Sequence, residues 1–100
     1  DVEIEIDNRE IFDVLVNNEK LSHEMMKVAS EVVGKENASI RDELVTGSED
    51  FADMLNVIPG AYCNIGHGET LPLHNDGFIL DENILPIGAS IYAKLVETRG

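Results

Sequence analysis

The residues of this sequence whose types could carry metal chemistry are its three histidines, and His74 has the most distinctive setting. It stands in Leu71-Pro72-Leu73-His74-Asn75-Asp76-Gly77-Phe78, where apolar residues and a proline precede it and polar turn residues follow. Such a segment anchors the backbone and leaves the imidazole on a loop, and neutral imidazole is a common zinc ligand. A zinc site needs three or four ligands, so the residues around His74 alone favour an ordinary loop histidine.

The other two histidines and the single cysteine have weaker claims to a site. His23 lies on the polar side of a predicted helix, which favours an exposed surface residue. His67, flanked by Gly66 and Gly68, lies in a flexible turn and is more typical of a loop residue than of a ligand. Cys63 lies between apolar neighbours, which favours a structural thiol, and one cysteine makes no internal disulfide.

A second candidate site is the turn Gly47-Ser48-Glu49-Asp50-Phe51. Small residues that open a helix leave free N–H groups, which bind anions. Adjacent acids at such a position also stabilise the helix dipole, and the residues of the turn by themselves favour plain capping over an anion site. Thr46 and Glu49 have the spacing of a capping box, and Ser48 is an alternative cap.

Three helices are predicted to position these residues, the last being the longest. Asn17-Asn18-Glu19 starts the first helix and Gly34 ends it. The second opens near Thr46 and stops at Pro59-Gly60, and the third follows Asp81-Glu82-Asn83 with Pro86 early in it. The apolar residues expected to face inward are Leu21, Met25, Val28, Ala29 and Val32, then Phe51, Met54, Leu55 and Ile58, then Ile87, Ile91, Leu95 and Val96.

Strands are predicted at residues 2–6, 38–41 and 61–66. Residues 2–6 alternate apolar and acidic side chains, as a strand with one buried face does. The order strand, helix, strand, helix, strand, helix indicates an α/β fold with a sheet covered by helices. A first strand whose nearest possible partner is residues 12–16 leads us to expect that the sequence is part of a longer polypeptide.

The charge of the chain argues against two classes of partner. With 20 acidic and 7 basic residues the formal net charge is −13, which disfavours nucleic acid and anionic membrane surfaces. No stretch approaches the roughly 20 apolar residues of a membrane span. The acidic N-terminus is unlike a signal peptide, so a cytoplasmic location is expected.

Five segments in order resemble the hippurate hydrolase and indole-3-acetyl-amino-acid hydrolase family, metal-dependent amidohydrolases related to aminoacylases and carboxypeptidases. The segments that carry the resemblance are Gly47-Ser48-Glu49-Asp50-Phe51-Ala52, Pro59-Gly60-Ala61-Tyr62, Leu73-His74-Asn75, Asp81-Glu82 and Leu85-Pro86-Ile87-Gly88-Ala89. The resemblance implies part of the catalytic domain of a two-metal amidopeptidase fold. Residues 1–13 would end an inserted lid and dimerisation domain, and residues 14–100 would form the C-terminal part of the catalytic domain.

The resemblance also implies roles for residues. His74 matches a histidine that binds a divalent metal (Zn, Mn, Co or Ni), and Gly47, Ser48 and Glu49 become candidate substrate contacts. The family's other ligands, in a Cys-Gly-His-Asp-x-His segment, a Glu-Glu pair and a further histidine, do not occur here, and neither does its catalytic glutamate. We therefore expect no catalytic residue in this chain, no tight metal binding by it alone and no activity without the remainder, which would hydrolyse N-acyl amino acids by metal-assisted attack of water.

Two other functions remain open at this point. One is a non-catalytic interaction module that retains the fold, and the other is a small-anion binding protein that uses residues 47–49. We expect the uncovered strand edges and apolar helix faces of this chain to be paired with another copy of itself in a homo-oligomer, or the chain to be prone to aggregation.

Overall fold

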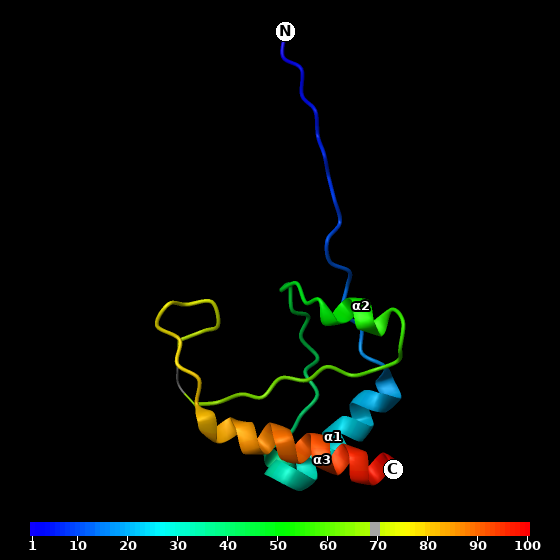
Figure 1. Ribbon diagram of the computed structural model, residues 1–100, viewed down its shortest axis with the longest axis vertical. Coiled ribbons are helices and arrows are strands. Elements are labelled where there is room, and N and C mark those ends of the chain that lie inside the picture. The colour runs from blue at the N-terminus through cyan, green and yellow to red at the C-terminus, as the bar shows by residue number, and fades with distance from the viewer. Residues whose placement is uncertain (69–70) are drawn as a thin grey trace.

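The computed structural model describes residues 1–68 and 71–100; Glu69 and Thr70, within the predicted loop after His67, lie outside the described residues. The helical elements in chain order are α1 (Glu19–Val33), the short 3₁₀ helix η1 (Lys35–Asn37), α2 (Phe51–Leu55), the 3₁₀ helix η2 (Glu82–Ile84) and α3 (Leu85–Arg99). Long connections join η1 to α2 and α2 to η2. Residues 1–12 extend away from the rest of the molecule (Figure 1).

The ends of α1 are those that its capping residues predict. The Asn18 side chain accepts a hydrogen bond of 3.0 Å from the Leu21 backbone N–H, which satisfies one free donor of the first turn. Gly34 ends the helix at φ 91°, a conformation that favours glycine, and its N–H donates to the Ser30 carbonyl at 2.9 Å.

The start of α3 is also local in origin. The Asp81 side chain accepts from the Asn83 N–H at 3.0 Å and opens η2, which runs directly into α3. Pro86 occupies the first turn, where a missing N–H costs no intrahelical bond. Helices α1 and α3 both contain 15 residues, so the expectation that the last helix is the longest was wrong.

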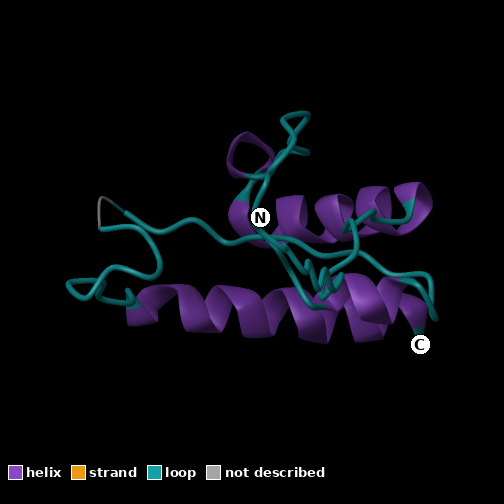
Figure 2. Ribbon diagram, turned by 90° about the horizontal axis from the view of Figure 1, so that it is seen from above, coloured by secondary structure: helices purple, strands orange, loops and turns teal. Residues whose placement is uncertain are grey.

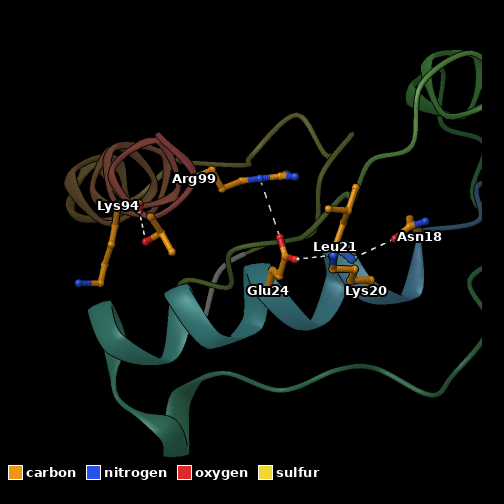
Figure 3. Close-up of polar contacts among 7 residues, drawn as sticks. Asn18, Lys20, Leu21, Glu24, Lys94 and Arg99 are labelled. Carbon is orange, nitrogen blue, oxygen red and sulfur yellow. Dashed lines mark hydrogen bonds and ion pairs between the residues drawn. The ribbon is translucent and has the colours of Figure 1, made fainter.

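The core lies between α1 and α3, which Figure 2 shows as the two long helices. Its buried residues are Val28, Ala29 and Ile91, and the partly buried apolar residues packed against them are Met26, Val32, Ala38, Ile87 and Leu95. Lys94 pairs with Glu31 at 3.0 Å, and Arg99 lies 3.9 Å from Glu24 across the same contact (Figure 3). These pairs are partly exposed and contribute at most about 1 kcal/mol each, so apolar packing holds the two helices together.

The prediction of an α/β fold was wrong: within residues 1–68 and 71–100 the structure contains no strand. A strand requires a repeated ladder of backbone bonds to a neighbour. Residues 17–18 meet residues 60–62 through one backbone bond, from Asn18 N–H to the Gly60 carbonyl at 2.9 Å, and the Asn17 side chain replaces the next rung. The apolar side chains that alternate with acidic ones in residues 2–6 are not buried: Val2, Ile4 and Ile6 are exposed.

Two expectations about inward-facing residues also failed. Val96 on α3 is 72% exposed, whereas Ile91 on the same helix is buried. Helix α2 has only five residues and buries Ala52, whereas Met54 and Ile58 are exposed. A helix of five residues has little more than one turn, so it cannot bury the whole row of apolar residues predicted from Phe51 to Ile58.

The chain is less compact than a typical folded domain of its mass. Its accessible surface is 8942 Å², against about 5,600 Å² from the usual scaling, and its radius of gyration is 17.8 Å, against about 13 Å. Apolar side chains on the extended segments account for much of this exposure. In the described part of the chain, no helix combines the length and the apolar character that spanning a bilayer requires.

Candidate functional site

Glu49, at the end of the turn 47–49, is held by two hydrogen bonds. Its Oε1 accepts from the Phe51 backbone N–H at 3.2 Å, and its Oε2 accepts from the Tyr62 hydroxyl at 3.0 Å. The Phe51 and Tyr62 rings lie beside each other with centroids 5.4 Å apart. Both carboxylate oxygens of Glu49 therefore have a fixed donor, and its side chain is partly buried.

Tyr62 is itself positioned by Asn17, 45 residues away in the sequence. The Asn17 side-chain amide donates to the Tyr62 carbonyl at 2.9 Å, and the Asn17 Oδ1 accepts from the Tyr62 N–H at 2.7 Å. Nearby, the Asn56 amide donates to Asp13 at 3.0 Å. An amide side chain that meets both backbone groups of one residue acts as a neighbouring peptide would.

These contacts shift the acidity of the cluster. The pKa of Glu49 is lowered by its hydrogen bond with the Asp50 carboxyl, then by the Phe51 N–H and the Tyr62 hydroxyl. The pKa of Asp50 is raised by the same bond and by the charge of Glu49. The pKa of Tyr62 is raised because its proton is bound to the Glu49 carboxylate. The lower pKa of the pair thus falls on Glu49, whose carboxylate oxygens accept the hydrogen bonds from Phe51 and Tyr62.

The other predicted residues of this turn play no part in a cap. Residues 46–48 are exposed and precede the helix, which begins at Phe51 with Asp50 at its N-cap position and no side-chain cap bond. Glu49 binds the Phe51 N–H in place of the predicted Thr46 or Ser48. Gly47 and Ser48 therefore present an open backbone and a hydroxyl to solvent.

His74 lies in a pair of tight turns and has an unusual backbone conformation. Its φ is +67°, a region that non-glycine residues seldom adopt, and its side chain is exposed. The Asn75 N–H donates to the Pro72 carbonyl at 3.3 Å, which closes a four-residue turn with His74 in the third position. At the base of the loop, His67 meets the Phe78 ring edge-on with centroids 5.6 Å apart.

The structure does not bring His74 and Glu49 into one site. The loop of residues 71–78 (yellow) and α2 (green) lie on separate sides of the molecule in Figure 1. No group of three or more His, Cys, Asp or Glu side chains that could hold a metal occurs among the described residues. The donors described here do not fit a complete metal site.

The remaining candidates stand apart from both turns. Burial raises the pKa of Cys63, which favours the structural thiol over a reactive one. His23 is exposed on α1, in keeping with a surface residue. A shallow hollow of about 540 Å³ lies beside α1 and is lined by Lys27, Ser30, Glu31 and Lys35, far in sequence from both turns.

Sequence reasoning missed Asn17 and Tyr62 as members of the Glu49 cluster. Asn17 read as part of a helix cap, and Tyr62 as one residue of a strand. Their contacts join residues 13 and 45 positions apart, and no local pattern encodes such a pairing. The one available signal was the position of Tyr62 just after the predicted end of a helix, because a tyrosine hydroxyl commonly finds a hydrogen-bond partner.

Comparison with known proteins adds a family. Residues 1–98 match the model of peptidase family M20/M25/M40. Relatives include a hippurate hydrolase of Campylobacter jejuni, 30% identical over 95% of this chain and 25% of its own length, and thermostable carboxypeptidase 2 of Saccharolobus solfataricus, 32% identical over 86% and 22%. An IAA-amino acid hydrolase of Arabidopsis thaliana, ILR1-like 2, is 34% identical over 87% and 20%.

The chain therefore spans about a quarter or less of the length of these curated relatives. No solved structure matches it significantly. The resemblance to hippurate and indole-3-acetyl-amino-acid hydrolases is confirmed by relatives bearing those names. The match extends over nearly all of the sequence, and the chain belongs to peptidase family M20/M25/M40.

Proposed function

We propose that this chain works as part of a metal-dependent amidohydrolase whose substrate is a small N-acyl amino acid or a related amide. The observation that carries the proposal is the match of residues 1–98 to a peptidase family whose relatives here include hydrolases of hippurate and of IAA-amino acids. Both names describe an acyl group joined to an amino acid through an amide. The bond proposed to be cleaved is that amide.

Within this assembly, we assign His74 as one donor to a divalent metal, with Zn, Mn, Co and Ni as candidates. Its imidazole is exposed on a tightly turned loop, and its φ of +67° is a disfavoured conformation of the kind that clusters at functional sites. The other donors and the general base are proposed to come from residues outside this chain, because the described residues hold no further set of converging ligands.

The turn 47–49 is proposed to contact the substrate. Glu49 is fixed by Tyr62 and the Phe51 N–H, so its carboxylate can accept hydrogen bonds from an amide N–H without moving. Ser48 and Gly47 are exposed beside it. Residues 1–13 are assigned to the end of a lid and dimerisation domain and residues 14–100 to the catalytic domain, in a cytoplasmic homo-oligomer.

The test compares the 100-residue chain with the full reading frame that encodes it. Both proteins are assayed with hippurate and N-acetyl amino acids, with and without a chelator. We expect chelator-sensitive turnover from the longer protein and none from residues 1–100 alone. His74→Ala in the longer protein should lower kcat by orders of magnitude, while His23→Ala, the matched surface histidine, should leave kcat unchanged. Full activity in His74→Ala would refute the assignment.

One observation favours a second function, a non-catalytic module that binds a protein partner. The apolar side chains of Tyr92 and Val96 on α3 are each 72% exposed, and Leu85 is 57% exposed on the same helix. Exposed apolar surface of this kind commonly marks an interface. Absence of turnover from the full reading frame, together with a stable complex with another protein that Tyr92→Ala weakens, would favour this module over the hydrolase.

A further inference from the structure

Among the described residues, the hydrogen bonds that hold His74 in the loop of residues 71–78 join residues close to it in sequence. We infer that Asn75 is the positioning residue of this loop: it keeps His74 in its left-handed conformation and so sets the direction of the imidazole. The importance of that direction for a metal rests on the proposed function, but the conformational inference does not.

Asn75 takes part in three hydrogen bonds, one through its backbone N–H, one through its backbone carbonyl and one through its side chain. Its N–H donates to the Pro72 carbonyl at 3.3 Å, and its carbonyl accepts from the Phe78 N–H at 3.0 Å. Its Oδ1 accepts from the Gly77 N–H at 2.9 Å. The turn that contains His74 and the turn that follows it therefore share this one residue.

The Asn75 side chain also packs into the loop at Gly77. A Cβ added to Gly77 would lie 2.6 Å from the Leu71 side chain and 3.3 Å from the Asn75 Oδ1. The two arms of the loop thus approach each other at Gly77, and the Asn75 side chain occupies the space beside it. A side-chain change at Asn75 therefore acts on the second turn through the bond to Gly77, and on the first turn through the backbone that the two turns share.

A left-handed residue other than glycine needs such support. Its Cβ crowds the backbone, so an isolated histidine at this position prefers negative φ. A four-residue turn with positive φ at its third position forms readily with glycine there and less readily with histidine. Removing the Asn75 side chain should release the second turn, and His74 should then return to an extended conformation.

The experiment is NMR spectroscopy of the 100-residue chain and two variants. A residue with positive φ has a short distance between its own amide and α protons, which gives a strong nuclear Overhauser effect (NOE). We expect that signal at His74 in the parent chain and its loss in Asn75→Ala, with faster amide exchange at Gly77. Asn75→Asp retains an acceptor oxygen and should keep the signal. Asn64→Ala, an exposed asparagine outside the loop, is the control.

The inference is overturned if Asn75→Ala keeps the His74 signal, or if Asn75→Asp loses it as completely as Asn75→Ala does. Helical circular dichroism (CD) that matches the parent chain shows that α1 and α3 remain folded in each variant. The outcome is independent of the enzyme assay: an active His74→Ala hydrolase would refute the proposed role of His74 in metal binding and leave the role of Asn75 in the loop intact.

Discussion

The turn that carries Glu49 and the loop that carries His74 are built in opposite ways. Glu49 is fixed by Tyr62, which Asn17 holds from 45 residues away. His74 is fixed by bonds among residues 72–78 and by the contact of Phe78 with His67. The first depends on the tertiary fold, whereas the second depends on a short stretch of sequence.

This difference separates two kinds of support for a functional side chain. A locally built loop retains its shape when distant parts of the chain rearrange, because its hydrogen bonds span three residues. A cluster assembled from distant residues loses its geometry when any of the segments moves. The pKa values of its members therefore depend on the tertiary fold. Perturbations of the core should therefore change Glu49 and leave His74 unchanged.

The largest effect is expected from Ile91→Ala in the helix core. Ile91 is 7% exposed between α1 and α3, and truncation of a buried isoleucine costs about 2–4 kcal/mol of unfolding free energy. Urea denaturation followed by helical CD measures the loss. At the temperature where the helix pair begins to separate, the His74 NOE should persist after the Glu49–Tyr62 contact is lost.

The matched control is Tyr92→Ala, one residue away but 72% exposed on the outer face. Its unfolding free energy should change by no more than about 0.5 kcal/mol. Equal losses in the two variants would show that the outer face of α3 is covered as well, and that the core does not lie where the structure has it.

Asn17→Ala is expected to have the next largest effect. It removes both hydrogen bonds to the Tyr62 backbone, and at partly exposed positions the pair contributes about 1 kcal/mol. Urea denaturation should show that loss, and a carbon-13 NMR titration should show the pKa of Glu49 rising as Tyr62 moves. Asn64→Ala controls for the loss of an exposed amide, and an unchanged Glu49 titration in Asn17→Ala would contradict the link between the two segments.

Tyr62→Phe tests the acidity of the cluster with a smaller change. The hydroxyl lowers the pKa of Glu49 together with the Asp50 carboxyl and the Phe51 N–H, so its loss should raise that pKa part of the way to the ordinary 4.5. An acid with a lowered folded pKa stabilises the fold above its unfolded pKa, and the contribution is lost as the pH falls through the folded value. In Tyr62→Phe this contribution should be smaller, and its loss should be complete at a higher pH.

Carbon-13 titration of Glu49 measures that shift directly. Tyr92→Phe removes a hydroxyl from an exposed tyrosine on α3 and should leave the Glu49 titration unchanged. The His74 NOE should be the same in both variants. If the Glu49 titration does not respond to Tyr62→Phe, the pKa of Glu49 is set by Asp50 and the backbone N–H alone.

The smallest effect is expected from Ser48→Ala. Ser48 is exposed and precedes α2 without capping it, so unfolding free energy should change by less than about 0.5 kcal/mol. In the proposed longer hydrolase, a rise in KM with unchanged stability would identify Ser48 as a substrate contact. If Ser48→Ala instead lowers the unfolding free energy by about 1 kcal/mol, as the loss of a helix cap typically does, then Ser48 caps α2.

The sequence by itself determined the helices that begin and end on local chemistry. Asn18 and Gly34 bound α1, and Pro86 lies in the first turn of α3, as their side chains and backbone preferences predict. Five segments in order, from residues 47–52 to residues 85–89, were enough to identify the family. Capping and φ preference are carried by residues a few positions apart, and the order of motifs is a property of the sequence itself, so all three can be read without coordinates.

The tertiary structure decided which extended segments pair with another segment and which apolar faces are buried. Alternation in residues 2–6 predicts a half-buried strand, but a ladder exists only where a second segment lies beside it, and Val2 is 88% exposed. Val96 has the spacing of an inward residue, yet the crossing of α1 and α3 leaves it outside the core. The bonds of Asn17 and Glu49 to Tyr62 arise from the same cause, because long-range contacts depend on how the elements pack.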